Sequence, residues 1–236
     1  MTGKNCQGHE QESGSRMSAD YKEHLSKQLN KQAGGELLGA YIAAGWVERA
    51  PSLKAKFEIA ELCAQEIGHA LMIYELLTEL GNDVDRLACE TLPVDYFSPY
   101  PATWIEFVVF HYLIDSAARH LVSDLVECSW APAARVMQKI YAEEDGHVEH
   151  AELWIEELCA QSDDRTAIQK ALDDWLPRIG KLFGKPQCAI NQARLELGIQ
   201  RYENESLRTA WYEEVRATLT SLGLMAPATL TCKTSL

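Results

Sequence analysis

Two short segments of the chain carry the same pair of metal-binding residue types at the same spacing. Glu66 precedes His69 by three residues, and Glu144 precedes His147 by three residues. On an α-helix, residues i and i+3 lie on one face, so both side chains can hold one ion. One such pair in an acidic chain is most simply a solvated surface pair. Two copies in apolar-periodic stretches, each with Gly directly before the His, favour a metal site instead.

Such a site needs further carboxylates, and the turns of the chain indicate where they lie. In four-helix bundles that hold two metals, two helices supply Glu-x-x-His and the other two supply one carboxylate each. Suppose that a tight turn joins the helix with the lone acid to the helix with Glu-x-x-His. The acid and the pair then lie at the same height along the bundle when both are equally far from that turn. Reflecting the first pair through the turn expected at Pro51 leads to Glu36. Reflecting the second pair through Pro132 leads to Asp115.

Two other acids, Glu106 and Asp124, fit this arrangement less well. Glu106 would need its turn inside its own helix, and Asp124 would need a turn inside the following helix. The preferred acids precede the Glu of their Glu-x-x-His pairs by 30 residues in the first half and 29 in the second. The sequence therefore predicts an internal two-helix repeat. The six predicted metal ligands are Glu36, Glu66, His69, Asp115, Glu144 and His147.

Helical periodicity and breaker residues predict the elements that carry these side chains. A short polar helix is expected over residues 21–32. A separate apolar helix is expected to follow Gly34 and Gly35. Further helices are expected over residues 53–80, 103–128, 132–161, 165–179 and 204–222, with a turn over 182–186.

Residues 81–100 lose the helical pattern, and Pro93, Pro99 and Pro101 exclude a regular helix there. Twenty extended residues reach about 60 Å, whereas a helix of about 27 residues is about 40 Å long. The segment can therefore run the length of a bundle, as the crossover of ferritin-like folds does. We predict an all-α, ferritin-like four-helix bundle with one long crossover and additional C-terminal helices. Residues 1–20 are expected to be disordered, 21–224 to form the di-iron domain, and 225–236 to be a flexible tail.

The composition excludes several classes of protein. With 236 residues, 47% of them hydrophobic, the chain can bury a sizeable core. A net charge of −13 argues against nucleic-acid partners and anionic membrane surfaces. There is no apolar stretch of bilayer length and no signal-peptide segment, so we expect a cytoplasmic protein. The seven scattered cysteines contain no Cys-x-x-Cys pair and indicate reduced thiols.

The donor set indicates which metals the site would hold. Four carboxylates and two imidazoles without a thiolate suit iron, with manganese as the alternative, better than zinc. Two iron ions would use dioxygen as co-substrate, and the bundle core would shield the reaction from water.

Several polar residues lie close to the predicted ligands in the sequence, and each has an expected place. Glu143 could hydrogen-bond a ligating His, or it could face the solvent. Gln65 occupies the equivalent place in the first half. His111, one turn from Asp115, is expected to be a satisfied core histidine. His150 and Glu58 are expected at the surface.

The sequence resembles the catalytic subunit of the phenylacetyl-CoA epoxidase family, whose members are bacterial multicomponent di-iron monooxygenases. The likeness extends from about residue 35 to about residue 222, and an Asp as lone acid of the second half is typical of that family. The aldehyde-deformylating oxygenases share ligand types, but their lone acids are Glu and their spacing differs. The segments that carry the likeness are Gln65-Glu66-Ile67-Gly68-His69-Ala70-Leu71-Met72-Ile73-Tyr74, Tyr100-Pro101-Ala102-Thr103-Trp104, Tyr112-Leu113-Ile114-Asp115-Ser116-Ala117-Ala118, Trp175-Leu176-Pro177 and Leu182-Phe183-Gly184.

The resemblance implies insertion of one oxygen atom from dioxygen into an aromatic or unsaturated acyl group, carried as a coenzyme A thioester. It also implies electrons from an external reductase, a structural sister subunit, and a homo- or hetero-oligomer. The chain departs from the family in being shorter and in having Gln65 where an acid is expected. These departures leave two alternatives open: oxidation of a free small acid or natural-product intermediate, and a non-catalytic ferritin-like protein that is structural or binds iron.

Cations that could hold the phosphates of coenzyme A occur near the two predicted helix turns. Arg49, Lys54 and Lys56 lie near the first turn, and Arg135 and Lys139 near the second. Charges at helix turns also serve solubility, so the sequence does not assign them a binding role.

Overall fold

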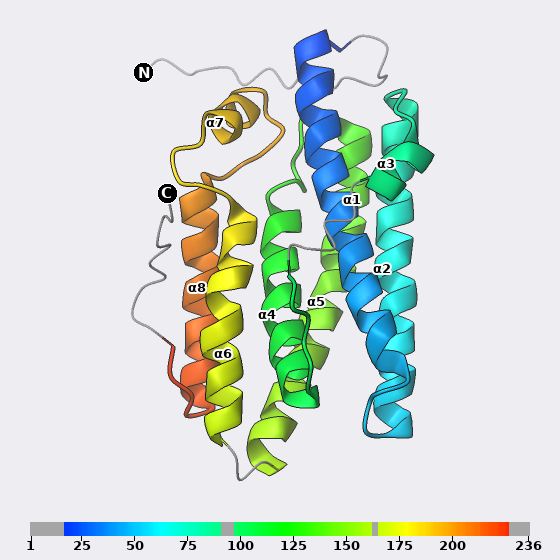
Figure 1. Cartoon of the computed structure of the whole chain (residues 1–236). Coiled ribbons are helices and arrows are strands. Elements are labelled where there is room, and N and C mark those ends of the chain that lie inside the picture. The colour runs from blue at the N-terminus through cyan, green and yellow to red at the C-terminus, as the bar shows by residue number, and fades with distance from the viewer. Residues whose placement is uncertain (1–16, 91–96, 162–164, 227–236) are drawn as a thin grey trace.

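The computed structural model describes residues 17–90, 97–161 and 165–226, and within these ranges all regular structure is helical. Four long helices form the central bundle, and the site lies among them. They are α1 (Ala19–Val47), α2 (Leu53–Glu79), α4 (Trp104–Ser123) and α5 (Ala131–Gln161). Figure 1 shows α1 and α2 as one antiparallel pair and α4 and α5 as another. The predicted ferritin-like bundle is confirmed.

A second layer of helices covers the α4 side of this bundle. Helices α6 (Arg165–Ile179) and α8 (Asn204–Ser221) run alongside α4, and α7 (Ala189–Glu196) lies near one end of that layer (Figure 1). Trp211 of α8 is fully buried and donates its indole N–H to Ser116 of α4 over 2.9 Å. The predicted additional C-terminal helices are therefore packed against the bundle core.

The predicted break at Gly34 and Gly35 is wrong, because α1 runs without interruption from Ala19 to Val47. The segment expected to be a separate polar helix buries Leu25 and Leu29 in the same apolar cluster as Ile73 of α2. An interior glycine costs a helix about 1 kcal/mol relative to alanine, and packing along the whole length of α2 offsets this cost. The apolar periodicity is too sparse to show that both parts belong to one helix.

Three short helical segments were not predicted. Helix α3 (Val84–Glu90) lies within the crossover, before its prolines, where Asp83 accepts from the backbone N–H of Arg86. The other two are α7 and the 3₁₀ turn η2 (Gly180–Phe183). Helix α4 ends at Ser123, earlier than expected.

Helix ends agree closely with the sequence signals elsewhere. Ser52 caps α2, and its side chain accepts from the Ala55 N–H. Thr103 caps α4 in a reciprocal capping box with Glu106.

Several predictions concern residues outside the described ranges. These are the terminal segments, apart from residues 17–20 and 225–226. The five cysteines within the described ranges are all free thiols. None of the described helices combines the length and apolar character needed to cross a bilayer.

Candidate metal centre

The six predicted ligands all lie in the interior of the bundle. Each comes from the middle of a long helix, and none has more than 7% of its surface exposed. Helix α1 supplies Glu36 and α4 supplies Asp115, whereas α2 and α5 each supply a Glu-x-x-His pair. Six ionisable side chains in one dry core are costly unless they are paired or hold a cation.

Four of these residues form a tight group. One donor atom from each of Glu36, Glu66, His69 and Glu144 can be chosen so that all four lie within 4.8 Å of one another. Nδ1 of His69 lies 3.2 Å from Oε1 of Glu144 and 3.7 Å from Oε2 of Glu36. The structure thus brings Glu36, the acid that the reflection indicated, beside His69.

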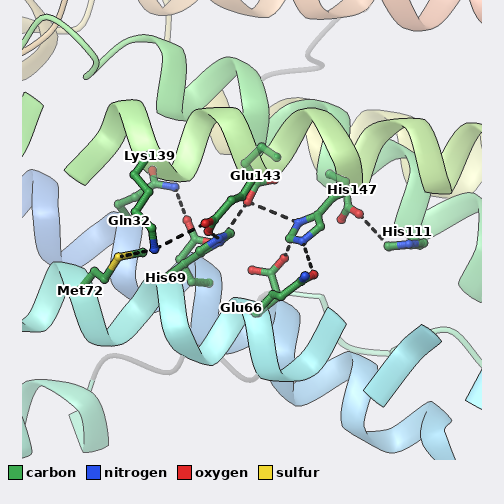
Figure 2. A network of polar contacts seen from close by, with 12 residues as sticks. Gln32, Glu66, His69, Met72, His111, Lys139, Glu143 and His147 are labelled. Atoms are coloured by element: carbon green, nitrogen blue, oxygen red, sulfur yellow. Dashed lines mark hydrogen bonds and ion pairs between the residues drawn. The ribbon is translucent and has the colours of Figure 1, made fainter. Parts of the chain in front are cut away.

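His147 joins this group from the other side. Its Nδ1 lies 3.3 Å from Oε1 of Glu66 and 3.6 Å from Oε1 of Glu144. Figure 2 shows His69 and His147 between α2 and α5, with Glu66 facing the His147 ring. Glu144 Oε1 is thus near both imidazoles.

Hydrogen bonding within the protein leaves the inner atoms of this cluster unsatisfied. Buried atoms without a hydrogen-bond partner include Nδ1 of His69, Nδ1 of His147, both carboxylate oxygens of Glu144 and Oδ2 of Asp115. Leaving a buried donor or acceptor unpaired costs about 1–3 kcal/mol. These are the atom types that iron and manganese accept as ligands, so the donor atoms of the cluster fit such a metal ion.

The electrostatics of the cluster point the same way. Burial, and then the charge of Glu144, raise the pKa of Glu66 well above its ordinary value. Burial acts against protonation of His69, but the nearby carboxylates of Glu144 and Glu36 outweigh it and raise its pKa to about 10. For His147, burial is again outweighed, by the nearby carboxylates of Glu144 and Glu66, and its pKa rises to about 11. The surrounding carboxylates therefore favour protonated, positively charged imidazoles. A divalent cation can supply this positive charge in place of the ring protons.

The outer nitrogens of the two histidines are held in matching ways. Nε2 of His69 lies 2.9 Å from Oε2 of Glu143, and Nε2 of His147 lies 2.9 Å from Oε1 of Gln65. Both rings therefore direct Nδ1 into the cluster. Of the two interpretations of Glu143, the structure supports the contact with a ligating His. Glu143 is nevertheless 43% exposed, and Lys139 lies 3.4 Å from its other oxygen.

Asp115 is placed differently from the other predicted ligands. It is not part of the four-residue group, and its Oδ2 lies 2.9 Å from Nδ1 of His111. It borders the same cavity as Glu36 and Glu66. The expectation for His111 is half correct, because its ring is 2% exposed but its Nε2 has no partner.

His150 and Glu58 are less exposed than expected. Their side chains are 28% and 21% exposed, and Nε2 of His150 lies 3.5 Å from Oε2 of Glu58. The His150 ring packs against Trp154 with 4.4 Å between ring centroids. The packing of α5 against α2 shields both side chains from solvent.

The two rejected acids have structural roles. Glu106 caps α4, where its side chain accepts from the Thr103 and Ala102 N–H groups. Asp124 is buried and accepts from the backbone N–H groups of Arg201 and Tyr202, each over 2.8 Å. Neither lies in the metal-ligand group.

A largely apolar cavity of about 390 Å³ opens beside the cluster, and sequence reasoning did not predict it. Its walls include the acids Glu36, Glu66 and Asp115. They also include apolar side chains of α1, α4, η2 and the segment before α4. Ile114, Ala118 and Leu121 are near Asp115 on α4, so helical spacing could have indicated them. Phe97 gave no such signal, because only the folded chain brings it here. The apolar side chains of the wall are Leu38, Ile42, Phe97, Phe110, Ile114, Ala118, Leu121 and Leu182.

The fold and the cluster together define a ferritin-like protein with a buried cluster of carboxylates and imidazoles that could hold a metal ion. Residues 7–235 match the phenylacetic acid catabolic protein family, and the chain belongs to that family. The chain is also 27% identical over 220 residues to one of the subunits of the 1,2-phenylacetyl-CoA epoxidase of Escherichia coli (strain K12), and the alignment covers 88% of this chain and 70% of the relative. These matches confirm the predicted resemblance and the predicted enzyme class, an oxidoreductase of the monooxygenase type.

Proposed function

We propose that the chain is a di-iron monooxygenase that inserts one oxygen atom from dioxygen into the aromatic or unsaturated part of an acyl substrate. The observation that carries the proposal is the apolar cavity whose wall includes Glu36, Glu66 and Asp115. An apolar group in this cavity lies directly beside the metal donor set. A ferritin-like iron store would have no need of such a cavity.

The six residues would hold the two ions as follows. The proposed ligands are Glu36, Glu66, His69, Asp115, Glu144 and His147, and Glu144 lies near both imidazoles. When bound, two ferrous ions supply the electrons that activate dioxygen, and an external reductase restores them. Glu143 and Gln65 fix the tautomers of the two histidines, so that each Nδ1 is free to coordinate.

The cavity residues orient the substrate and exclude water. Phe110, Ile114 and Leu121 offer an apolar wall to an aromatic ring, and an apolar wall keeps water from the reacting centre. A volume of about 390 Å³ accommodates an aryl or short acyl group, whereas coenzyme A would have to lie outside. Lys27 and Lys31 border this cavity, so they are the cations nearest to an anionic substrate end. Burial lowers the pKa of Lys31.

The cations considered from the sequence lie elsewhere. Arg49, Lys54, Lys56, Arg135 and Lys139 do not border the cavity. Arg49 donates to the carbonyl of Ala102, and Lys56 donates to carbonyls at the end of α1. We therefore place the coenzyme A end, if the substrate carries one, at the Lys31 side of the cavity.

The test is a substrate panel. Reduced, iron-loaded protein is mixed with oxygen, a reductase and aromatic acids, both free and as coenzyme A thioesters, and products are examined for a gain of one oxygen atom by mass. Turnover of thioesters alone supports an epoxidase-like enzyme. Turnover of free acids alone would replace the coenzyme A inference with a small-acid oxygenase. Absence of any oxygenated product, together with uptake of many iron atoms per chain, would contradict the proposal.

A further inference from the structure

Helix α2 carries an exposed apolar stripe on the face opposite the bundle core. We define the α2 stripe as six exposed residues spaced alternately four and three positions apart. Figure 1 shows α2 at the edge of the molecule, with α3 beside its C-terminal end. Such a 3.5-residue repeat is the pattern by which one helix packs along another. The members of the α2 stripe are Leu53, Phe57, Ala60, Ala64, Ile67 and Leu71.

The large members of the stripe are strongly exposed for apolar side chains. Leu53 is 83% exposed, Phe57 63%, Ile67 50% and Leu71 58%. Single exposed apolar residues are ordinary, whereas a continuous exposed patch marks an interaction site. The stripe covers about five helical turns, or about 27 Å.

The order of side-chain sizes in the α2 stripe is symmetric: it is the same when read from the N-terminal end of α2 and from the C-terminal end. Two large residues, Leu53 and Phe57, are followed by Ala60 and Ala64 and then by two further large residues. If a second α2 packs antiparallel about an axis near residue 62, Ala60 of each copy meets Ala64 of the other. The alanines allow the two backbones to approach closely at the centre, while the large side chains pack at both ends. A two-fold interface requires this kind of self-complementarity.

Charge also favours the antiparallel arrangement. Lys54, 76% exposed, lies at the N-terminal end of α2, whereas Glu75 and Glu79 are exposed at its C-terminal end. Antiparallel packing brings the basic end of one copy to the acidic end of the other. Parallel packing would place like charges together.

We propose that the α2 stripe is a dimer interface, which joins two copies of this chain through an antiparallel, two-fold contact of their α2 helices. This inference is independent of the metal chemistry. A contact one helix wide is small for a protein interface, so the dimer is expected to dissociate on dilution.

The first test is the mass of the full chain in solution, measured by sedimentation over a range of concentrations. We expect twice the chain mass of 26.5 kDa at high concentration. The variant Ala60→Lys/Ala64→Lys should be monomeric, because it places four cations at the centre of the interface. Ala160→Lys, a matched change at an exposed alanine of α5, should leave the dimer intact. A monomeric parent protein, or a dimer that persists in the double variant, would overturn the proposal.

A second variant tests the interface in the opposite direction. Glu61 is exposed beside the centre of the stripe, so its two copies lie close together in the proposed dimer. Glu61→Gln removes this repulsion and should lower the dissociation constant several-fold, a result that misfolding cannot mimic. An unchanged or raised dissociation constant would contradict the arrangement.

Cross-linking tests the register. Under mild oxidation, a mixture of Ala60→Cys and Ala64→Cys proteins should form a disulfide between positions 60 and 64, identified by peptide mapping. Cross-links confined to other positions would exclude the axis near residue 62.

Discussion

Oε1 of Gln65 lies 2.9 Å from Nε2 of His147, and this contact repeats that of Glu143 with His69 on the opposite helix. In each half, the residue directly before the ligand Glu of one helix holds the outer nitrogen of the His on the other. The two contacts differ in charge, because one partner is an amide and the other a carboxylate. A carboxylate partner makes an imidazole a stronger metal ligand. The two proposed metal positions are therefore unequal.

Changing the carboxylate partner to an amide, and separately the amide partner to a carboxylate, should shift metal affinity in opposite directions. We expect Glu143→Gln to weaken metal binding about tenfold and Gln65→Glu to strengthen it, both measured by competition with a chelator. Glu149→Gln, at an exposed position of the same helix, is the control and should change nothing. Equal affinities for all four proteins would show that the outer partners do not tune the site.

Removal of two carboxylates should abolish metal binding. Protein made in iron-replete cells should contain close to two metal ions per chain, whereas Glu66→Ala/Glu144→Ala should contain almost none. The control is Glu106→Gln, because this acid caps α4 away from the cluster. Elemental analysis that finds a single zinc ion, or metal unaffected by the double change, would refute the ligand assignment.

The position of Glu36 is the part of the site that the sequence predicted best, because it follows from helix geometry. Glu36 lies 3.7 Å from His69 because α1 and α2 are regular helices joined by a tight turn. Reflection through such a turn preserves height. Asp115 is predicted less completely, because residues 124–130 form a longer, irregular connection between α4 and α5. Reflection gives its height along the bundle but does not show that it faces His111.

Other features could not be predicted because they depend on contacts between distant residues. Phe97 enters the cavity wall beside Ile42 and Phe110, and no local pattern indicates that. Helices α3 and α7 have seven and eight residues, too few for a periodic signal. The continuity of α1 through Gly34 and Gly35 is likewise decided by its packing on α2.

The metal-free protein should lose stability as the pH rises above neutral. His69 and His147 have folded-state pKa values of about 10 and about 11, against 6.5 in the unfolded chain. A raised pKa gives stability that is complete below pH 6.5 and is lost as the pH rises through the folded value. We therefore expect urea midpoints of the metal-free chain to fall between about pH 6.5 and pH 11.

Metal loading should remove this dependence and release protons. A metal ion requires neutral imidazoles, so loading at neutral pH displaces the ring protons, about two per chain. An indicator dye in weak buffer measures their release, and urea midpoints of loaded protein should be nearly flat over the same pH range. Loading without proton release would contradict the raised pKa values.

Asp124 should matter for stability and not for metal binding. Its carboxylate is 1% exposed and accepts from the N–H groups of Arg201 and Tyr202. Asp124→Ala leaves these donors unpaired and should cost about 2 kcal/mol, measured by urea denaturation, with metal content unchanged. Glu127→Ala removes only an exposed ion pair with Arg201 and should cost less than about 0.5 kcal/mol. Loss of metal in the Asp124 variant would assign this acid to the site after all.

The cavity wall should decide which substrates enter. Ala118 borders the cavity one turn from Asp115, so Ala118→Phe fills part of the space without touching the proposed ligands. We expect KM for an aromatic substrate to rise at least about tenfold, with two metal ions still bound and smaller substrates less affected. Ala142→Phe, at an exposed position of α5, should leave both KM values unchanged. Equal effects of Ala118→Phe on large and small substrates would place the substrate elsewhere, because a narrowed cavity must discriminate by size.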